Sequence, residues 1–72
     1  MSRTEFISYI KSIGFERDIT RLSSFYLDVH YIIIMVDDYI LFSHFKEYEY
    51  ELNNTQPLIK IARKYKLKNL LK

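Results

Sequence analysis

A run of β-branched and aromatic residues from Phe25 to Val36 is the feature that most constrains how this chain folds. Such side chains fit the pleated surface of a sheet, and the run contains no glycine or proline that would interrupt a strand. We therefore expect one long strand over residues 25–36, with side chains that alternate between two faces. The run ends at Asp37 and Asp38, which predict a turn.

Two shorter segments after this turn predict further strands. Apolar residues resume at Tyr39–Ser43, and residues 47–52 alternate glutamate with tyrosine or leucine. The turn has no glycine, which favours a four-residue loop over a two-residue turn. Either connection pairs Ile33 with Phe42, so the three segments form an antiparallel meander.

One face of this sheet must be buried, and we expect it to be the face that holds Ile40 and Phe42. An odd-length loop near residues 43–46 would add the tyrosines of residues 47–52 to this face. An even-length loop would instead turn the glutamates into the core, at several kcal/mol each. The expected core face therefore comprises Leu27, Val29, Ile33, Met35, Ile40, Phe42, Tyr48 and Tyr50.

The opposite face would then be too apolar for the solvated side of an antiparallel sheet. We expect another surface to cover it, either the C-terminal segment of this chain or a second chain. On this interpretation the protein interface comprises Ile32, Ile34, Val36, Tyr39 and Leu41.

One helix is predicted before the strands. Ser2 and Glu5 have the spacing of a capping box, and apolar residues follow at helical spacing. Gly14, the only glycine of the chain, comes directly after them, where a left-handed residue commonly ends a helix. We expect a helix over residues 3–13 and a connecting loop over residues 15–24.

A second helix is predicted to start at Pro57, because proline is tolerated in the first turn. Its apolar residues change sides along the helix, with Leu58, Ile61, Ala62 and Tyr65 on one side and Leu67, Leu70 and Leu71 on the other. We therefore expect a break near Tyr65–Lys66. The predicted fold is α+β: an N-terminal helix, a three-stranded antiparallel β-meander and a C-terminal helix, with both helices on one sheet face.

Length and composition exclude several classes of protein. A chain of 72 residues is one small domain, residues 1–72, and without cysteine it has no disulfide framework. Its longest apolar run is far shorter than the roughly 20 residues that a membrane helix needs, and no secretory signal is visible. We expect a cytoplasmic protein. The excess of isoleucine, lysine and aromatic residues over glycine and alanine is common in AT-rich genomes, including those of many phages.

Few residues suggest catalysis or metal binding. In the expected register His30 and His44 fall on opposite faces of the sheet, where they could not share a metal ion. Asp37 and Asp38 fit a turn, and the glutamates of residues 47–52 fit a solvated edge strand. A single glycine cannot build a phosphate-binding loop. We therefore expect a non-enzymatic protein with no catalytic residues, no cofactor and no metal.

Charge is segregated along the chain. Residues 1–55 hold five Lys/Arg and nine Asp/Glu, a net charge of −4, whereas residues 56–72 hold six Lys/Arg and no acid, a net charge of +6. This pattern and the apolar face leave two functions open. The first is a protein-binding module, of inhibitor or adaptor type, that occupies the surface of another protein or of a second copy in a homo-oligomer.

The second function is nucleic-acid binding by the basic C-terminal segment, through phosphate contacts. The residues that would make these contacts are Lys60, Arg63, Lys64, Lys66 and Lys68. Binding to a membrane surface is disfavoured, because this segment has no tryptophan or phenylalanine and its apolar side reverses.

Overall fold

The computed structural model describes the backbone of residues 1–70 and the side chains of residues 1–68. The elements in chain order are α1 (Arg3–Ser12), β1 (Glu16–Arg17), β2 (Ser24–Leu27), β3 (His30–Ile34), β4 (Asp38–Ser43), β5 (Lys46–Glu51) and α2 (Gln56–Leu70).

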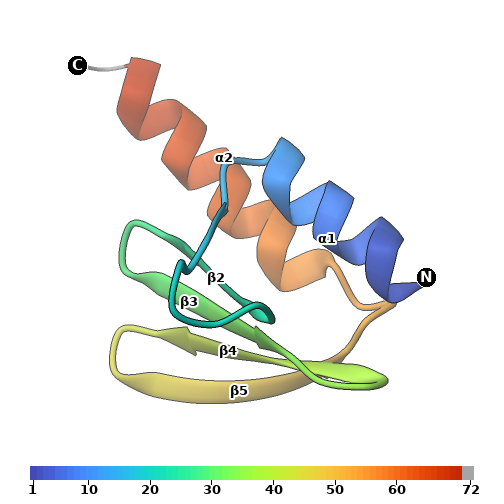
Figure 1. Ribbon diagram of the computed structural model, residues 1–72. Coiled ribbons are helices and arrows are strands. Elements are labelled where there is room, and N and C mark those ends of the chain that lie inside the picture. Colours follow the sequence, from blue (N-terminus) through green and yellow to red (C-terminus); the bar gives the residue numbers. More distant parts are fainter. Residues whose placement is uncertain (71–72) are drawn as a thin grey trace.

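The strands form one antiparallel sheet in which each strand pairs with its neighbour in sequence, from β1 at one edge to β5 at the other. Both helices lie on the same side of this sheet (Figure 1). The α+β class and the two terminal helices are confirmed, but the sheet has five strands instead of three. No helix within the described residues is both long and apolar enough to cross a membrane.

Helix α1 is capped as its sequence predicts. The Ser2 hydroxyl accepts a hydrogen bond from the Glu5 N–H at 3.1 Å, and the Glu5 carboxylate accepts one from the Ser2 N–H at 3.2 Å. At the other end, the N–H groups of Gly14 and Phe15 donate to carbonyls of the last turn at 3.1 and 2.9 Å, the two bonds of a Schellman motif. Gly14 has a φ of 117°, which explains why glycine occupies this position.

Residues 25–36 do not form one strand, contrary to the prediction. Asp28 and Val29 form a two-residue turn that folds the run into the β2–β3 hairpin, with Leu27 opposite His30. Asp28 has a φ of 55°, a conformation that aspartate adopts more readily than most residues. A single strand over this run would be about 40 Å long, longer than the largest dimension of the molecule, 37 Å.

The buried core lies between the sheet and the two helices. Its largest residue is Tyr39, which is fully buried and donates its hydroxyl to the Asn54 carbonyl at 2.6 Å. Burial raises the pKa of Tyr39 far above its usual range. The core comprises Phe6, Ile10, Phe15, Phe25, Leu27, Ile32, Ile34, Tyr39, Leu41, Leu52, Leu58 and Ile61.

The prediction grouped the residues of β3 and β4 correctly but chose the wrong face for the core. Ile33 pairs with Ile40 instead of Phe42, a shift of two residues that leaves all three side chains on one face. That face is turned away from the helices. The residues that alternate with them, among them Ile32 and Leu41, point into the core.

The β4–β5 turn explains why the faces are inverted. His44 and Phe45 form a two-residue turn with Ser43 opposite Lys46, so the connection is even, not odd as predicted. This register places the glutamates of β5 on the face that holds Ile40. Because carboxylates must remain in water, that face is the solvated one. The tyrosines of β5 then fall on the core side.

Helix α2 is continuous from Gln56 to Leu70, so the predicted break near Tyr65–Lys66 is wrong. Figure 1 shows that the C-terminal half of the helix extends past the sheet. Leu67, on the reversed apolar side, is 58% exposed. A continuous helix gains a hydrogen bond with each added residue, which outweighs leaving one leucine in water. The side chains of Leu70 and Leu71 lie outside the described residues.

Candidate functional site

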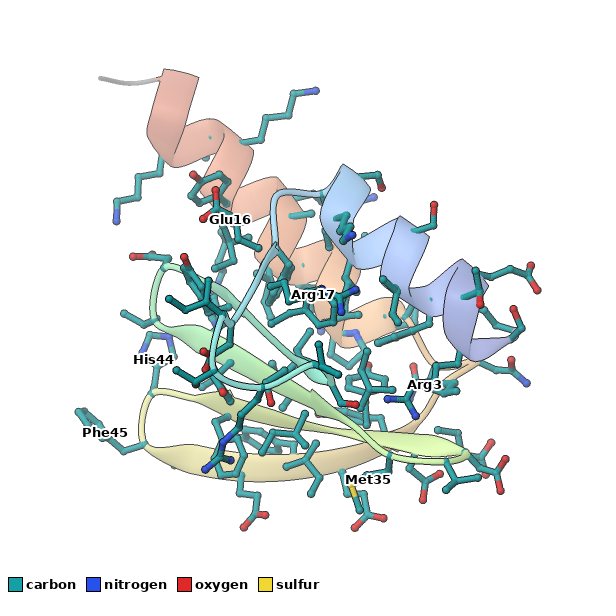
Figure 2. The ribbon with its side chains drawn as sticks, viewed as in Figure 1. Arg3, Glu16, Arg17, Met35, His44 and Phe45 are labelled. Carbon is teal, nitrogen blue, oxygen red and sulfur yellow. The ribbon has the colours of Figure 1, made fainter. Side chains whose placement is uncertain are left out.

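The face of the sheet that the helices leave open has an apolar centre. It consists of two cross-strand pairs from β3 and β4, whose four members are half-buried. Tyr26 of β2, which is 43% exposed, and Met35, which follows β3 and is 48% exposed, extend this centre. The side chain of Met35 points away from the helices in Figure 2. We call this surface the outer face; it comprises Tyr26, Tyr31, Ile33, Met35, Ile40 and Phe42.

Acidic residues border the outer face on both sides. On the β5 edge, Glu47 and Glu49 stand opposite its two β4 residues. On the β1 side, Glu16 and Asp18 accept hydrogen bonds from its two tyrosine hydroxyls, at 3.0 and 2.7 Å. The hydrogen bond from Tyr31 and, after it, those from the Thr20 hydroxyl and N–H lower the pKa of Asp18 to about 2, and this carboxylate is charged at neutral pH. The surface is therefore an apolar patch within an acidic border.

Four of the five residues predicted as a protein interface lie in the core. Ile32, Ile34, Tyr39 and Leu41 are at most 4% exposed and pack against residues of both helices. Only Val36, in the β3–β4 turn, is exposed, at 82%. Of the two covers that the sequence leaves open, this chain supplies one itself, because α1 and α2 pack on this face. The excess of apolar surface lies on the outer face instead.

A second feature is a hollow of about 150 Å³ at the corner where the β2–β3 and β4–β5 turns approach α2. It brings together side chains from two turns, the start of a strand and a helix that lie far apart in the sequence. We call it the corner pocket. It is lined by Asp28, Val29, His30, His44, Ile61, Lys64, Tyr65 and Lys68.

Two histidines meet in the corner pocket. The rings of His30 and His44 lie edge to face with centroids 5.8 Å apart, so the prediction that they fall on opposite sides is wrong. The Ser43 hydroxyl lies 2.8 Å from His30 Nδ1. Burial is the main cause that lowers the pKa of His30, followed by the charge of His44. Asp28 opposes this shift, and Lys64 adds to it.

The Ser43–His30 contact does not amount to a catalytic triad, which needs a carboxylate hydrogen-bonded to the imidazole. Among the described side chains, no carboxylate makes such a bond to His30. The Asp28 carboxylate instead lies 3.5 Å from the Lys68 ammonium. Nor does the described part of the chain hold a group of three or more His, Asp or Glu placed to bind a metal ion. Asp37 and Asp38, at the β3–β4 turn, line a separate hollow of about 400 Å³.

The five basic residues predicted to contact nucleic acid are all exposed on α2. Lys60, Lys64 and Lys68 recur every four residues and form one stripe along the helix, which leads into the corner pocket. Arg63 lies next to Lys60 at the edge of this stripe, whereas Lys66 points to another side of the helix. Because α2 and the outer face lie on opposite sides of the molecule, the segregation of charge along the sequence becomes a segregation in space.

Comparisons of this chain with models of protein families, with curated proteins and with solved structures found no match. The function is therefore argued from the geometry of the chain. Sequence reasoning missed both the outer face and the corner pocket. Two signals point to them: Asp28 inside the apolar run, which marks a turn, and the glutamates of β5, which mark the solvated face.

Proposed function

We propose that this protein is a binding module that holds another protein on its outer face. The observation that carries the proposal is an apolar centre on the side of the sheet opposite the two helices, with no further element of the described residues packed over it. The open face of an antiparallel sheet is normally polar, whereas an apolar centre within a polar border is the usual anatomy of a protein interface. The centre is rich in tyrosine and phenylalanine, which are enriched at such interfaces.

The acidic border indicates the chemistry of the partner. Glu16, Asp18, Glu47 and Glu49 complement an apolar surface surrounded by lysine and arginine. Two copies that packed outer face to outer face would bring like charges together. The basic surface of this chain, α2, lies on the opposite side of the molecule and would give an open-ended chain of copies. Of the two occupants that the sequence leaves open, the charge pattern favours a different protein.

The proposal is tested by capture and titration. Tagged protein captures partners from a lysate of the native source, and each purified partner is then titrated against wild type and Ile33→Glu. We expect Ile33→Glu to weaken binding at least about tenfold, which corresponds to about 1.4 kcal/mol, because it puts a carboxylate into the apolar centre. Replacing Glu47 and Glu49 by glutamine should lower the association rate and its salt dependence.

The matched control is Leu67→Glu, which makes the same change at an exposed apolar residue on α2. It should leave binding unchanged, and circular dichroism should show that both variants are folded. If every captured partner binds Ile33→Glu as tightly as wild type, the outer face is not the binding surface. If wild type is a monomer by light scattering, a homo-oligomer through this face is excluded as well.

We also propose nucleic-acid binding as a second function, because α2 is one continuous helix with five exposed cations. Contact with four or five phosphates gives a slope of about −3.6 to −4.5 for log K against log salt on duplex DNA. Fluorescence anisotropy with labelled duplex and single-stranded oligonucleotides at several salt concentrations measures this slope. No binding of either oligonucleotide at low salt would refute this function and leave the outer-face proposal intact.

A further inference from the structure

We propose that the corner pocket binds a tetrahedral oxyanion, a phosphate or sulfate group. Four side chains that donate hydrogen bonds or carry positive charge meet there: His30 at the start of β3, His44 in the β4–β5 turn, and Lys64 and Lys68 on α2. The hollow of about 150 Å³ is several times the roughly 30 Å³ that one water occupies. It therefore has room for an ion of this size.

The charges around the pocket favour an anion. Among the described residues that line the pocket, Asp28 is the one carboxylate, and it pairs with Lys68 at 3.5 Å. Among the described side chains no carboxylate lies within ion-pair distance of Lys64, which leaves its positive charge available. Tyr65 and the apolar residues Val29 and Ile61 complete the lining. The pocket thus has a net positive charge even when both imidazoles are neutral.

The backbone of the β4–β5 turn positions His44 at the pocket. His44 and Phe45 have φ values of 52° and 65°, so both central residues of the β4–β5 turn are left-handed. Such turns favour asparagine and glycine, and a side chain as bulky as phenylalanine is strained there. Figure 2 shows Phe45 pointing away from the molecule, where it is fully exposed. The turn places the His44 ring edge to face with the His30 ring, with centroids 5.8 Å apart.

Binding should strengthen as the pH falls. The groups that face His30 are Asp28 from the β2–β3 turn, His44 from the β4–β5 turn, and Lys64, Tyr65 and Lys68 from α2. A bound oxyanion favours protonation of the imidazoles and offsets the repulsion from Lys64. Protonation of the imidazoles as the pH falls from about 7.5 to about 5.5 adds positive charge beside the anion, and we expect affinity to rise about tenfold, which corresponds to about 1.4 kcal/mol.

The test uses sodium sulfate, because the charge of sulfate stays constant over this pH range, whereas inorganic phosphate gains and loses a proton within it. The full chain is titrated while the imidazole signals of His30 and His44 are followed by NMR, against sodium chloride at equal ionic strength. We expect saturable shifts of both signals, about tenfold tighter binding at the lower pH, and a higher pKa of His30 in sulfate. The variant Lys64→Gln should weaken binding at least about tenfold.

The matched control is Lys66→Gln, which removes the same charge from the other side of α2 and should change binding less than about twofold. His44→Asn removes an imidazole while keeping a residue that tolerates the left-handed turn, and it should also weaken binding. The proposal is overturned if sulfate shifts neither signal beyond chloride. It is equally overturned if Lys66→Gln weakens binding as much as Lys64→Gln, since the effect would then be general charge screening.

A second arm separates two sources of the anion. A single-stranded oligonucleotide that displaces sulfate from the imidazole signals would identify the phosphates of a nucleic acid as the natural ligand. Competition by free inorganic phosphate but not by the oligonucleotide would identify a small anion. Either result supports an oxyanion site, and neither depends on the outer face, which Ile33→Glu tests separately.

Discussion

Alanine substitutions at two neighbouring residues of β3 test which side of the sheet is the core. Ile32 is fully buried against the helices, whereas Ile33 is half-buried on the outer face. The substitutions Ile32→Ala and Ile33→Ala delete the same atoms one position apart. Any difference in their effects on stability therefore reports the environments of the two faces.

The structure sets the expected size of this difference. At Ile32 the change removes three buried carbons, each stabilising by about 0.8 kcal/mol, and leaves a cavity. We expect the free energy of unfolding to fall by about 3 kcal/mol, within the range of about 2–5 kcal/mol for such substitutions. A chain of this length has a total stability of roughly 4–11 kcal/mol, so this loss is a large fraction. Ile33→Ala should lower it by less than about 1 kcal/mol.

Urea unfolding followed by far-ultraviolet circular dichroism measures both values. The dependence of the unfolding free energy on urea should be the same for both variants, so that the midpoints report stability alone. If Ile33→Ala destabilises the protein as much as Ile32→Ala, the outer face is a buried surface. The proposal that it binds a partner would then fail together with the assignment of the core.

Three further predictions concern the backbone and pH. Gly14→Ala should lower the free energy of unfolding by about 1–2 kcal/mol. The added Cβ would lie 3.5 Å from Leu27 without a clash, so the cost comes from the φ of 117° alone. An unchanged midpoint of urea unfolding would contradict this. Phe45→Gly should raise the free energy of unfolding by about 1 kcal/mol and with it the melting temperature, because it removes the strain of a left-handed backbone at a residue whose side chain is fully exposed. A lower melting temperature would mean that the Phe45 ring packs against the protein. The Asp18 pKa of about 2 lies below its unfolded value, so its stabilisation is complete above about pH 4 and is lost as the pH falls toward about 2. Tyr31→Phe should raise this pKa in an NMR titration, and no rise would exclude the Tyr31 hydrogen bond as its cause.

Helix α1 could be predicted almost residue by residue because its signals are local. The capping box joins Ser2 and Glu5 within one turn, and the end of the helix depends on a single glycine, Gly14. These interactions act over three to five residues and are largely independent of tertiary structure. The predicted helix extended one residue too far, to Ile13, which is the C-cap.

The topology of the sheet could be predicted only in part, because it depends on packing. The period-two pattern correctly separated the residues of β3 and β4 into two faces, but both faces are apolar, so hydrophobicity alone did not show which one is covered. In the predicted strand Asp28 is a polar position on one face. A strand over residues 25–36 would be longer than the usual range of about 3–10 residues, and aspartate is suited to make the turn that divides it.

The corner pocket could not be predicted at all, since it depends on two turns and one helix that meet only in the folded chain. The predicted register pairs His44 with Tyr31 and therefore puts His30 and His44 on opposite faces of the sheet. In the structure Ser43 pairs with His30, and His44 lies in the β4–β5 turn. With the correct turns, both lie at the same end of the sheet beneath the lysine stripe of α2.

The glutamates of β5 connect the fold to the proposed function. Glu47 and Glu49 cannot enter the core, so they force the face that they share with Ile40 into water even though that face is apolar. On an edge strand they also oppose pairing with the same strand of a second copy, because equivalent glutamates would lie opposite each other. The same carboxylates therefore leave the outer face in water and oppose self-association through the edge of the sheet. On the proposal that the outer face binds another protein, they also favour a basic partner, and an apolar centre inside an acidic border is the anatomy that such a surface needs.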